Sequence, residues 1–189
     1  MFSWKGLADA RDFFEKVALP VVEKIISCEK PIISIVNGLA FGGGMELNLL
    51  FDIVIASNNA TFAVPEAGIG ALPPIASSLG VALYGKRLVE FILTGETLEA
   101  EEAKELGIVN LVVDSEQLED VAMEYAEKIA LSAPRSISSI RKVFAEVYST
   151  YSLPFKVAMR EILLLTQLED FKIGCGAFVK KKKPEWRNR

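Results

Sequence analysis

Apolar residues near the start of the chain recur with the period of a helix. Between positions 13 and 26 they return in pairs every four residues, which places them on one face of an amphipathic helix. Pro20 lies inside this stretch, and we expect it to kink or divide the helix because proline removes a backbone donor. The pairs are Phe13-Phe14, Val17-Ala18, Val21-Val22 and Ile25-Ile26.

The stretch from Pro31 to Asp52 changes pattern twice. The apolar run 32–36 predicts a short strand, and Asn37-Gly38 ends it with residues that tolerate positive φ. Three glycines, 42–44, then precede an apolar helix that carries Glu46 in its first turn. The start of a helix leaves backbone N–H groups unpaired and favours negative charge, so this point is suited to hold an anionic oxygen. The glycines could equally serve only to let the helix pack closely on a strand.

The chain then alternates between short strands and helices. Strands are predicted at 53–56 and 61–64, and Glu66 is expected to emerge from the end of the second, just after Pro65. Taken alone, Glu66 is better explained as a solvated loop carboxylate than as a catalytic group. Asp114 and Gln117 have the spacing of a capping box. Further elements are expected at 75–85 (a helix interrupted by Gly80), 87–93, 99–106 (ending at Gly107), 108–113 (a strand), 118–129, 137–148 and 154–168.

Composition excludes several classes of function. The 189 residues are 51% apolar and carry a net charge of −4, with no basic stripe, so nucleic acid is not an expected partner. The absence of histidine removes Ser-His and Cys-His pairs and the commonest zinc ligand, so no metal site is expected and acid–base chemistry is left to carboxylates, Lys or Tyr. Cys28 and Cys175 suit free thiols in a reducing cytoplasm. No signal peptide or membrane span is predicted.

Two motifs in register resemble the signature of the enoyl-CoA hydratase/isomerase (crotonase) family. Lys30–Asp52 follows the family pattern KPxIAxxNG to GGGxELxxxxD almost position by position, and Thr61–Glu66 matches its FxxPE segment at the usual distance. The similarity extends over roughly Glu29 to Trp186. Weaker matches to the family's LTG, AxxAxxxGLV and AFxEKR segments lie at Leu93–Gly95, Ala100–Val109 and Gly176–Lys180.

The resemblance implies a fold as well as a reaction. The expected fold is α/β, a crotonase-like (ClpP/crotonase) spiral of ββα units with a helical C-terminal region. We divide it into a partial spiral core, 1–114, and a helical region for oligomerisation and coenzyme A contact, 115–189. The family's AFxAGxD loop, which supplies one of two oxyanion donors, has no counterpart here, so the spiral is expected to be incomplete at its N-terminal side.

The activity implied by the resemblance is reversible hydration of a 2-enoyl-CoA thioester. The Gly43 N–H would stabilise the thioester oxygen, Glu46 would help deprotonate the attacking water, and Glu66 would deliver a proton to C2, although the two glutamates could exchange roles. Their mutual repulsion and partial burial would raise one pKa and leave one group ionised. An enoyl-CoA isomerase, or a catalytically incomplete acyl-CoA-binding subunit or fragment, remains an open alternative.

The resemblance also implies partners. Phe178 and Lys180 match the aromatic and basic positions that lie near the adenosine phosphates of coenzyme A, which is part of the substrate rather than a cofactor. The lysine run 180–183 could also be no more than a solvated terminus. The run 162–165 is too apolar for one narrow core stripe, and family members form trimers paired into hexamers. A cytoplasmic homotrimer or hexamer is therefore expected.

Overall fold

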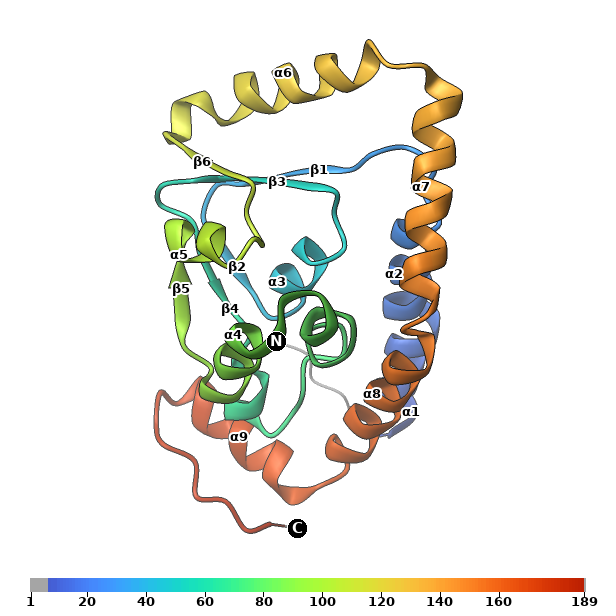
Figure 1. Cartoon of the computed structure of the whole chain (residues 1–189). Coiled ribbons are helices and arrows are strands. Elements are labelled where there is room, and N and C mark those ends of the chain that lie inside the picture. Colours follow the sequence, from blue (N-terminus) through green and yellow to red (C-terminus); the bar gives the residue numbers. More distant parts are fainter. Residues whose placement is uncertain (1–6, 189) are drawn as a thin grey trace.

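Two small sheets form the centre of the chain in a computed structural model that describes residues 7–188 (Figure 1). The first sheet has the order β1-β3-β6 and is parallel throughout. The second has the order β2-β4-β5, in which β2 and β4 are parallel and β5 is antiparallel to β4. The strands are β1 (Ile33–Val36), β2 (Leu39–Phe41), β3 (Ile53–Ser57), β4 (Thr61–Ala63), β5 (Thr97–Glu99) and β6 (Leu111–Val113).

Consecutive strands turn from one sheet into the other. The chain passes from β1 to β2 at Asn37-Gly38 and from β3 to β4 at Asn58-Asn59. As a result, β3 pairs with β1 in the first sheet, and β4 pairs with β2 in the second. The Thr61 N–H donates to the Gly38 carbonyl at 3.2 Å, which joins the two corners. A helix follows each pair, so the chain builds the ββα spiral that the resemblance implies.

Helices surround the sheets on several sides (Figure 1). Helix α6 lies across the β1-β3-β6 sheet, α7 descends beside the core, and α8 and α9 close the far end. The helices are α1 (Leu7–Phe13), η1 (Phe14–Ala18), α2 (Leu19–Ile26), α3 (Gly43–Asn48), η2 (Pro65–Ile69), η3 (Ala76–Gly80), α4 (Val81–Thr94), α5 (Ala100–Glu105), η4 (Ser115–Gln117), α6 (Leu118–Ala130), α7 (Pro134–Ser149), α8 (Ser152–Leu165) and α9 (Glu169–Val179).

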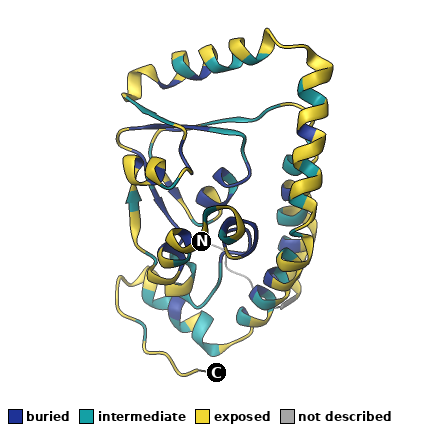
Figure 2. Cartoon of the chain, viewed as in Figure 1, coloured by how far each residue is buried: buried dark blue, intermediate teal, exposed yellow. Residues whose placement is uncertain are grey.

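The main core lies between the sheets and the helices α3 and α4 (Figure 2). Met45, Leu49 and Leu50 are buried where α3 ends, and they pack in the same cluster as Phe62 and Leu88. A smaller cluster of Ile55, Leu118 and Ala122 fixes α6 to the other face of the first sheet. Helix α3, which carries Glu46, is therefore held on its buried side by the largest apolar cluster of the described chain.

Of two expected helix interruptions, one is present. The N-terminal helix is divided beside Pro20, because the π-helix η1 ends two residues before it and Pro20 occupies the first turn of α2. Gly80 is helical and packs against Leu49 and Leu88, whereas Gly85 breaks the helix with φ 66° and ψ −149°. The prediction for Gly80 was wrong because close packing, not a turn, requires that glycine.

The capping box predicted at Asp114 is also wrong. No side-chain cap is formed there, and Asp114 Oδ1 instead accepts a hydrogen bond from Asn58 Nδ2 at 2.8 Å. A capping box is present at α5, where Glu99 and Glu102 exchange hydrogen bonds with each other's backbone N–H groups. The strand predicted over 108–113 is confined to Leu111–Val113, and β5 and α9 were not predicted.

Arg141 fastens α7 to the core and was not identified from the sequence. Its side chain is 2% exposed, and Nη1 lies 2.6 Å from Asp52 Oδ1. Nε and Nη2 donate to the carbonyls of Cys28 and Ile25 at 3.1 and 3.0 Å. The other oxygen of Asp52 accepts the Ile32 N–H at 2.7 Å, so one ion pair joins α7, the end of α2 and the start of β1.

Candidate active site

The start of α3 presents an exposed backbone turn. Gly42, with φ 57°, precedes the helix, and its N–H donates to the Ala63 carbonyl at 2.8 Å. Gly43 is exposed, and a Cβ at this position would meet nothing within 4 Å. Among residues 7–188, none of the backbone hydrogen bonds outside the regular elements has the Gly43 N–H as its donor. This N–H is therefore open to an acceptor from outside the chain.

Asn48 holds this turn against the first sheet. Its Nδ2 donates to the Gly44 carbonyl at 2.8 Å, and its Oδ1 accepts from Ser34 Oγ on β1 at 2.7 Å. Asn48 is buried, so both bonds are shielded from water. The short helix α3 consequently has a fixed position relative to β1, which a six-residue helix could not maintain alone.

Glu46 is a buried carboxylate held by a loop distant in sequence. The residue is 5% exposed, and its Oε1 accepts the N–H groups of Ile75 at 2.6 Å and Ala76 at 2.9 Å. Burial raises the pKa of Glu46 to about 8, the charge of Glu66 adds to the rise, and the two N–H donors partly offset it. The stiff Pro73-Pro74 segment leads directly to these donors.

Glu66 approaches the same turn from the second sheet. It follows β4 as predicted, but it lies in the first turn of the 3-10 helix η2 rather than in an extended segment. Its Oε1 is so close to Gly42 that a Cβ there would lie 2.8 Å away, and its Oε2 is buried without a hydrogen-bond partner. Burial raises the pKa of Glu66 to about 7, and its own backbone N–H partly offsets the rise.

Both glutamates are connected to the turn at Gly42. The backbone N–H of Glu46 donates to the Gly42 carbonyl at 2.9 Å, Glu66 Oε1 would lie 2.8 Å from a Cβ at Gly42, and the charge of Glu66 acts on the Glu46 carboxyl. Two carboxyl groups with raised pKa values, next to an open backbone N–H, are suited to hold a water molecule and exchange protons with a bound molecule near neutral pH.

Phe178 and Lys180 are not part of this cluster. Phe178 is 61% exposed in the last turn of α9, and Lys180 is the exposed residue that ends the helix. Cys28 and Cys175 are free thiols, and no disulfide joins them. Within 7–188, no three His, Cys, Asp or Glu side chains gather in a way suited to a metal ion.

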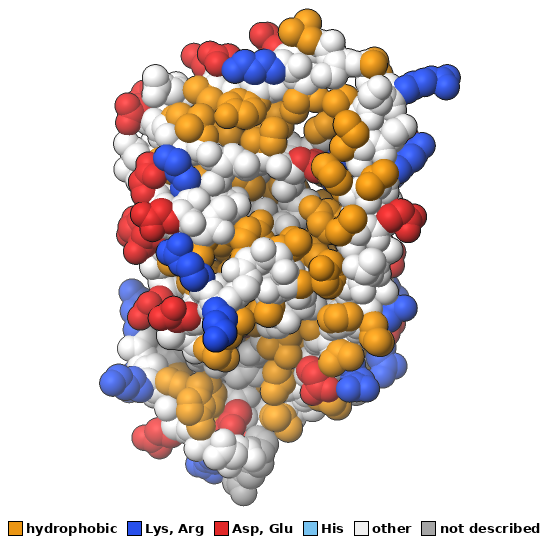
Figure 3. All heavy atoms as spheres, in the orientation of Figure 1, with side chains coloured by type: hydrophobic (Ala, Val, Ile, Leu, Met, Phe, Trp, Pro, Cys, Tyr) orange, Lys and Arg blue, Asp and Glu red, His pale blue; other side chains and the backbone are white. Residues whose placement is uncertain are grey.

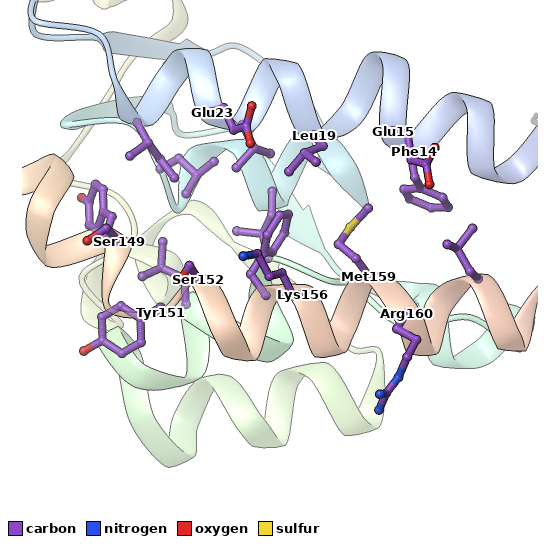
Figure 4. A pocket seen from close by; sticks show the side chains of 18 residues that line it. Phe14, Glu15, Leu19, Glu23, Ser149, Tyr151, Ser152, Lys156, Met159 and Arg160 are labelled. Carbon is purple, nitrogen blue, oxygen red and sulfur yellow. The ribbon is translucent and has the colours of Figure 1, made fainter.

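An apolar cavity of about 390 Å³ is lined in part by Ile75, and Figure 4 shows it from close by. It separates the N-terminal helices from α8, and Leu19 and Met159 face it from opposite sides. Ile75 joins the two places, because its backbone N–H binds Glu46 while its side chain lines the cavity. This cavity was not predicted from the sequence. The late helices have an excess of apolar residues, but that excess does not reveal which helices face each other.

The chain is similar to known proteins in sequence and in structure. The family model described as "Enoyl-CoA hydratase/isomerase" matches residues 5–189. Carnitinyl-CoA dehydratases of Proteus mirabilis (strain HI4320) and Citrobacter koseri are each 36% identical to the chain over 176 residues, which are 88% of this chain and 66% of the relative. The chain therefore spans slightly less than two thirds of the length of these curated relatives.

Solved structures show the same relation. A carnitinyl-CoA hydratase from Mycobacterium avium is 34% identical, with a TM-score of 0.78 over 85% of this chain and 64% of that one. An enoyl-CoA hydratase from the same species has a TM-score of 0.82 over 96% of this chain and 70% of that one, at 23% identity, which supports the fold alone. In the part of the chain from 7 to 188, no helix has the length and apolar character needed to cross a membrane.

Proposed function

The chain belongs to the enoyl-CoA hydratase/isomerase family, and on that basis we propose that it catalyses the reversible addition of water across the 2,3 double bond of an enoyl-CoA thioester. The observation that carries this proposal is the placement of Glu66 Oε1 against Gly42, where its charge acts on the Glu46 carboxyl, beside the open Gly43 N–H. An acid, a base and an oxyanion donor are the three groups that such a hydration requires.

Gly43 would act on the thioester oxygen. When water adds at C3, negative charge accumulates on this oxygen, and a donor already fixed in place lowers the barrier without reorganisation. Loss of one such donor typically lowers the rate by about 10² to 10³. The position of Gly43 is maintained by the Asn48 bonds to Gly44 and Ser34, so we expect the donor to be rigid.

The glutamates would divide the proton transfers. We assign Glu46 as the base that takes a proton from water, because the N–H groups of Ile75 and Ala76 stabilise negative charge on its Oε1. Glu66, with one buried oxygen unpartnered, would carry the proton to C2. The higher pKa of Glu46 favours the reverse assignment, but the two groups face each other and titrate as a pair, so the assignment follows their hydrogen bonds.

Hydration of crotonyl-CoA by the purified chain tests the proposal. We expect turnover that falls by about 10² or more in Glu46→Gln and in Glu66→Gln, since each removes one proton-transfer group. Glu96→Gln, at an exposed position of the same charge, is the matched control and should retain full activity. Binding of crotonyl-CoA without turnover would reject hydration in favour of the binding role, and isomerisation of a 3-enoyl-CoA retained in one glutamate variant would favour the isomerase.

The apolar cavity is the proposed place for the acyl group. Its walls are mostly apolar, and Ile75 connects it to Glu46. Activity towards longer straight-chain 2-enoyl-CoA thioesters should therefore equal or exceed that towards crotonyl-CoA. Because the relatives named above are called carnitinyl-CoA dehydratases, carnitinyl-CoA is the competing substrate for the same assay. Leu79→Trp, which would partly fill the cavity, should reduce activity most for long acyl chains.

Contacts with coenzyme A are proposed for Phe178 and Lys180. Both are exposed at the end of α9, and Lys181, Lys182 and Lys183 add positive charge beside them. Lys180→Ala should raise the KM for acyl-CoA and leave kcat unchanged, as expected for a contact to a non-reacting part of the substrate. Lys16→Ala, in the N-terminal helices, serves as the control for loss of one surface charge.

Assembly into a trimer or hexamer is also part of the proposal. The helical region from 115 onward would supply the contacts, because α7 exposes Ile140, Val143, Phe144 and Val147. Figure 3 shows apolar side chains gathered beneath α6 and along α7. Light scattering should find three or six copies, and Val143→Glu should shift the assembly to monomers. Fractionation of cells tests the proposed cytoplasmic location.

A further inference from the structure

Helix α9 and the turn that carries Glu66 touch backbone to backbone. A Cβ at Gly174 would lie 2.5 Å from the Ile69 carbonyl carbon, and a Cβ at Gly70 would lie 3.0 Å from the backbone of Asp170. Ile69 and Gly70 end η2, three and four residues after Glu66. Gly174 and Asp170 are four residues apart, so they share one face of α9.

Both glycines are needed for this approach, for different reasons. Gly174 lies inside a helix, where glycine is less favourable than alanine by about 1 kcal/mol, yet no Cβ can be accommodated. Gly70 has φ 74°, and its neighbours are backbone atoms that cannot rotate away. Gly176, two residues further along α9, has open space where its Cβ would be. The close contact is therefore specific to one face of the helix.

The C-terminal tail holds the other end of this face. Asp170 Oδ1 and Oδ2 accept the N–H groups of Arg187 and Asn188 at 2.7 and 2.8 Å, and Arg187 also lies 3.5 Å from Glu169. The tail is thereby folded back onto the first turn of α9. The tail therefore contacts α9, and α9 contacts η2, which carries Glu66.

We propose that Gly174 and Gly70 are positioning residues, which set how closely η2 packs on α9 and thereby hold the Glu66 carboxyl against Gly42. The chain needs such a support because Glu66 Oε2 is buried without any hydrogen bond that would fix it. The backbone N–H that bonds to this carboxyl is that of Glu66 itself, in the first turn of η2, so the position of η2 sets where the carboxyl lies. This inference rests on the proposed role of Glu66 in proton transfer, but the placement itself can be tested without activity.

Gly174→Ala and Gly176→Ala form a matched pair. Each adds one methyl group to α9 and improves helix propensity equally, but only the first pushes η2 away. We expect Gly174→Ala to lower kcat by about 10², since a displacement of about 1 Å at a reacting group has effects of this size, while KM changes by less than about threefold. Gly176→Ala should match the unmodified protein in both constants.

The titration of the Glu66 carboxyl reports its position without an activity assay, because burial raises its pKa. The titration is followed by carbon-13 NMR of the glutamate carboxyl groups, with the Glu66 signal assigned by its loss in Glu66→Gln. In Gly174→Ala we expect the midpoint of this titration to fall by about one pH unit or more, because a displaced η2 admits water. The charge of Glu66 acts on Glu46, so the titration of Glu46 is followed in the same spectra. On α9, Asp170 is occupied by the tail.

A second matched pair covers the case in which Gly174→Ala does not fold. Gly70→Ala meets backbone at 3.0 Å, whereas Gly107→Ala has the same positive φ and open space. Both variants carry the strain of a side chain at positive φ, but only Gly70→Ala should also displace η2 and move the midpoint of the Glu66 titration. An unchanged midpoint in every folded variant overturns the inference. A shifted midpoint in a protein without hydratase activity supports the positioning and rejects the proposed function instead.

Discussion

Charge is buried at two places in this chain, and the two are built in opposite ways. At α7, Arg141 meets Asp52, and the remaining guanidinium donors reach the carbonyls of Cys28 and Ile25. At α3, Glu46 and Glu66 have the same charge, and no salt bridge within 7–188 neutralises either. The first arrangement joins three segments. The second raises two pKa values and leaves an oxygen of Glu66 unpartnered.

The difference separates a structural cluster from a chemical one. A buried ion pair in which each guanidinium nitrogen has a partner ties segments of the fold together, whereas two neighbouring carboxyl groups do not. Such a pair is typical of sites that hold or move protons. The carboxyl pair should therefore tolerate replacement of either glutamate by glutamine without loss of stability, and the ion pair should not tolerate a neutral replacement of Arg141.

The largest effect is expected from Arg141→Met. Removal of the guanidinium leaves Asp52 partly buried without its partner, and such changes lower the free energy of unfolding by about 3–5 kcal/mol. Urea unfolding at pH 7 measures the loss. The neighbouring Lys142→Met is the control, because Lys142 pairs with Glu29 at the surface and should matter little. Equal losses in the two variants would contradict the structural role of Arg141.

A gain in stability is expected from Glu46→Gln at high pH. The folded protein holds a proton on Glu46 up to a pKa of about 8, whereas the unfolded chain releases it near 4.5. The stabilising contribution is thus complete below pH 4.5 and is lost as the pH rises through 8. Glutamine keeps an acceptor for Ile75 and Ala76 but cannot ionise. At pH 8.5 the free energy of unfolding of the variant should exceed that of the unmodified protein by on the order of a few kcal/mol.

Glu46→Ala is the control for this gain. It also removes the titration, but it leaves two buried N–H groups without an acceptor, each of which costs about 1–3 kcal/mol. The alanine variant should therefore be less stable than glutamine at every pH. If unfolding measured from pH 5 to 9 has the same pH dependence in Glu46→Gln and in the unmodified protein, the raised pKa is refuted.

Gly42→Ala should produce a smaller loss. A side chain at φ 57° is strained by about 1–2 kcal/mol, and its Cβ would also press on Glu66 Oε1. Gly85→Ala has a similar positive φ with open space and measures the strain alone. We expect hydratase activity to fall only in Gly42→Ala. Comparable activity in the two variants would show that Gly42 does not set the position of Glu66.

The smallest effect is expected from Glu66→Gln. Glu66 is less buried than Glu46, and its pKa of about 7 gives the same sign: stability is complete below 4.5 and is lost through 7. The variant should be more stable than the unmodified protein at pH 8.5, by less than Glu46→Gln is, because the pKa of Glu66 is raised less. Thermal unfolding of both variants, with Glu96→Gln as the exposed control, checks the order; the reverse order would mean that Glu66 is the more deeply buried group.

Short-range patterns determined much of the fold. The apolar run before Asn37-Gly38, the glycines before α3 and the glycine after α5 define elements through turn chemistry and periodicity, which act over a few residues. The same stretch, with the second motif, was sufficient to single out Gly43, Glu46 and Glu66. Their roles remain predictions, but their proximity in the structure agrees with the motifs.

Tertiary structure alone decided the supports around that site. Arg141 and Asp52 are 89 positions apart, and Gly174 lies more than 100 positions after Ile69, so no local period connects them. The same holds for the N–H groups of Ile75 and Ala76 that bind Glu46, and for the cavity behind them. Local sequence specifies which elements form and where chemistry can occur. The tertiary structure decides which distant backbone groups and charges reach the site, because close packing between the turns of the spiral forms only when the whole chain has folded.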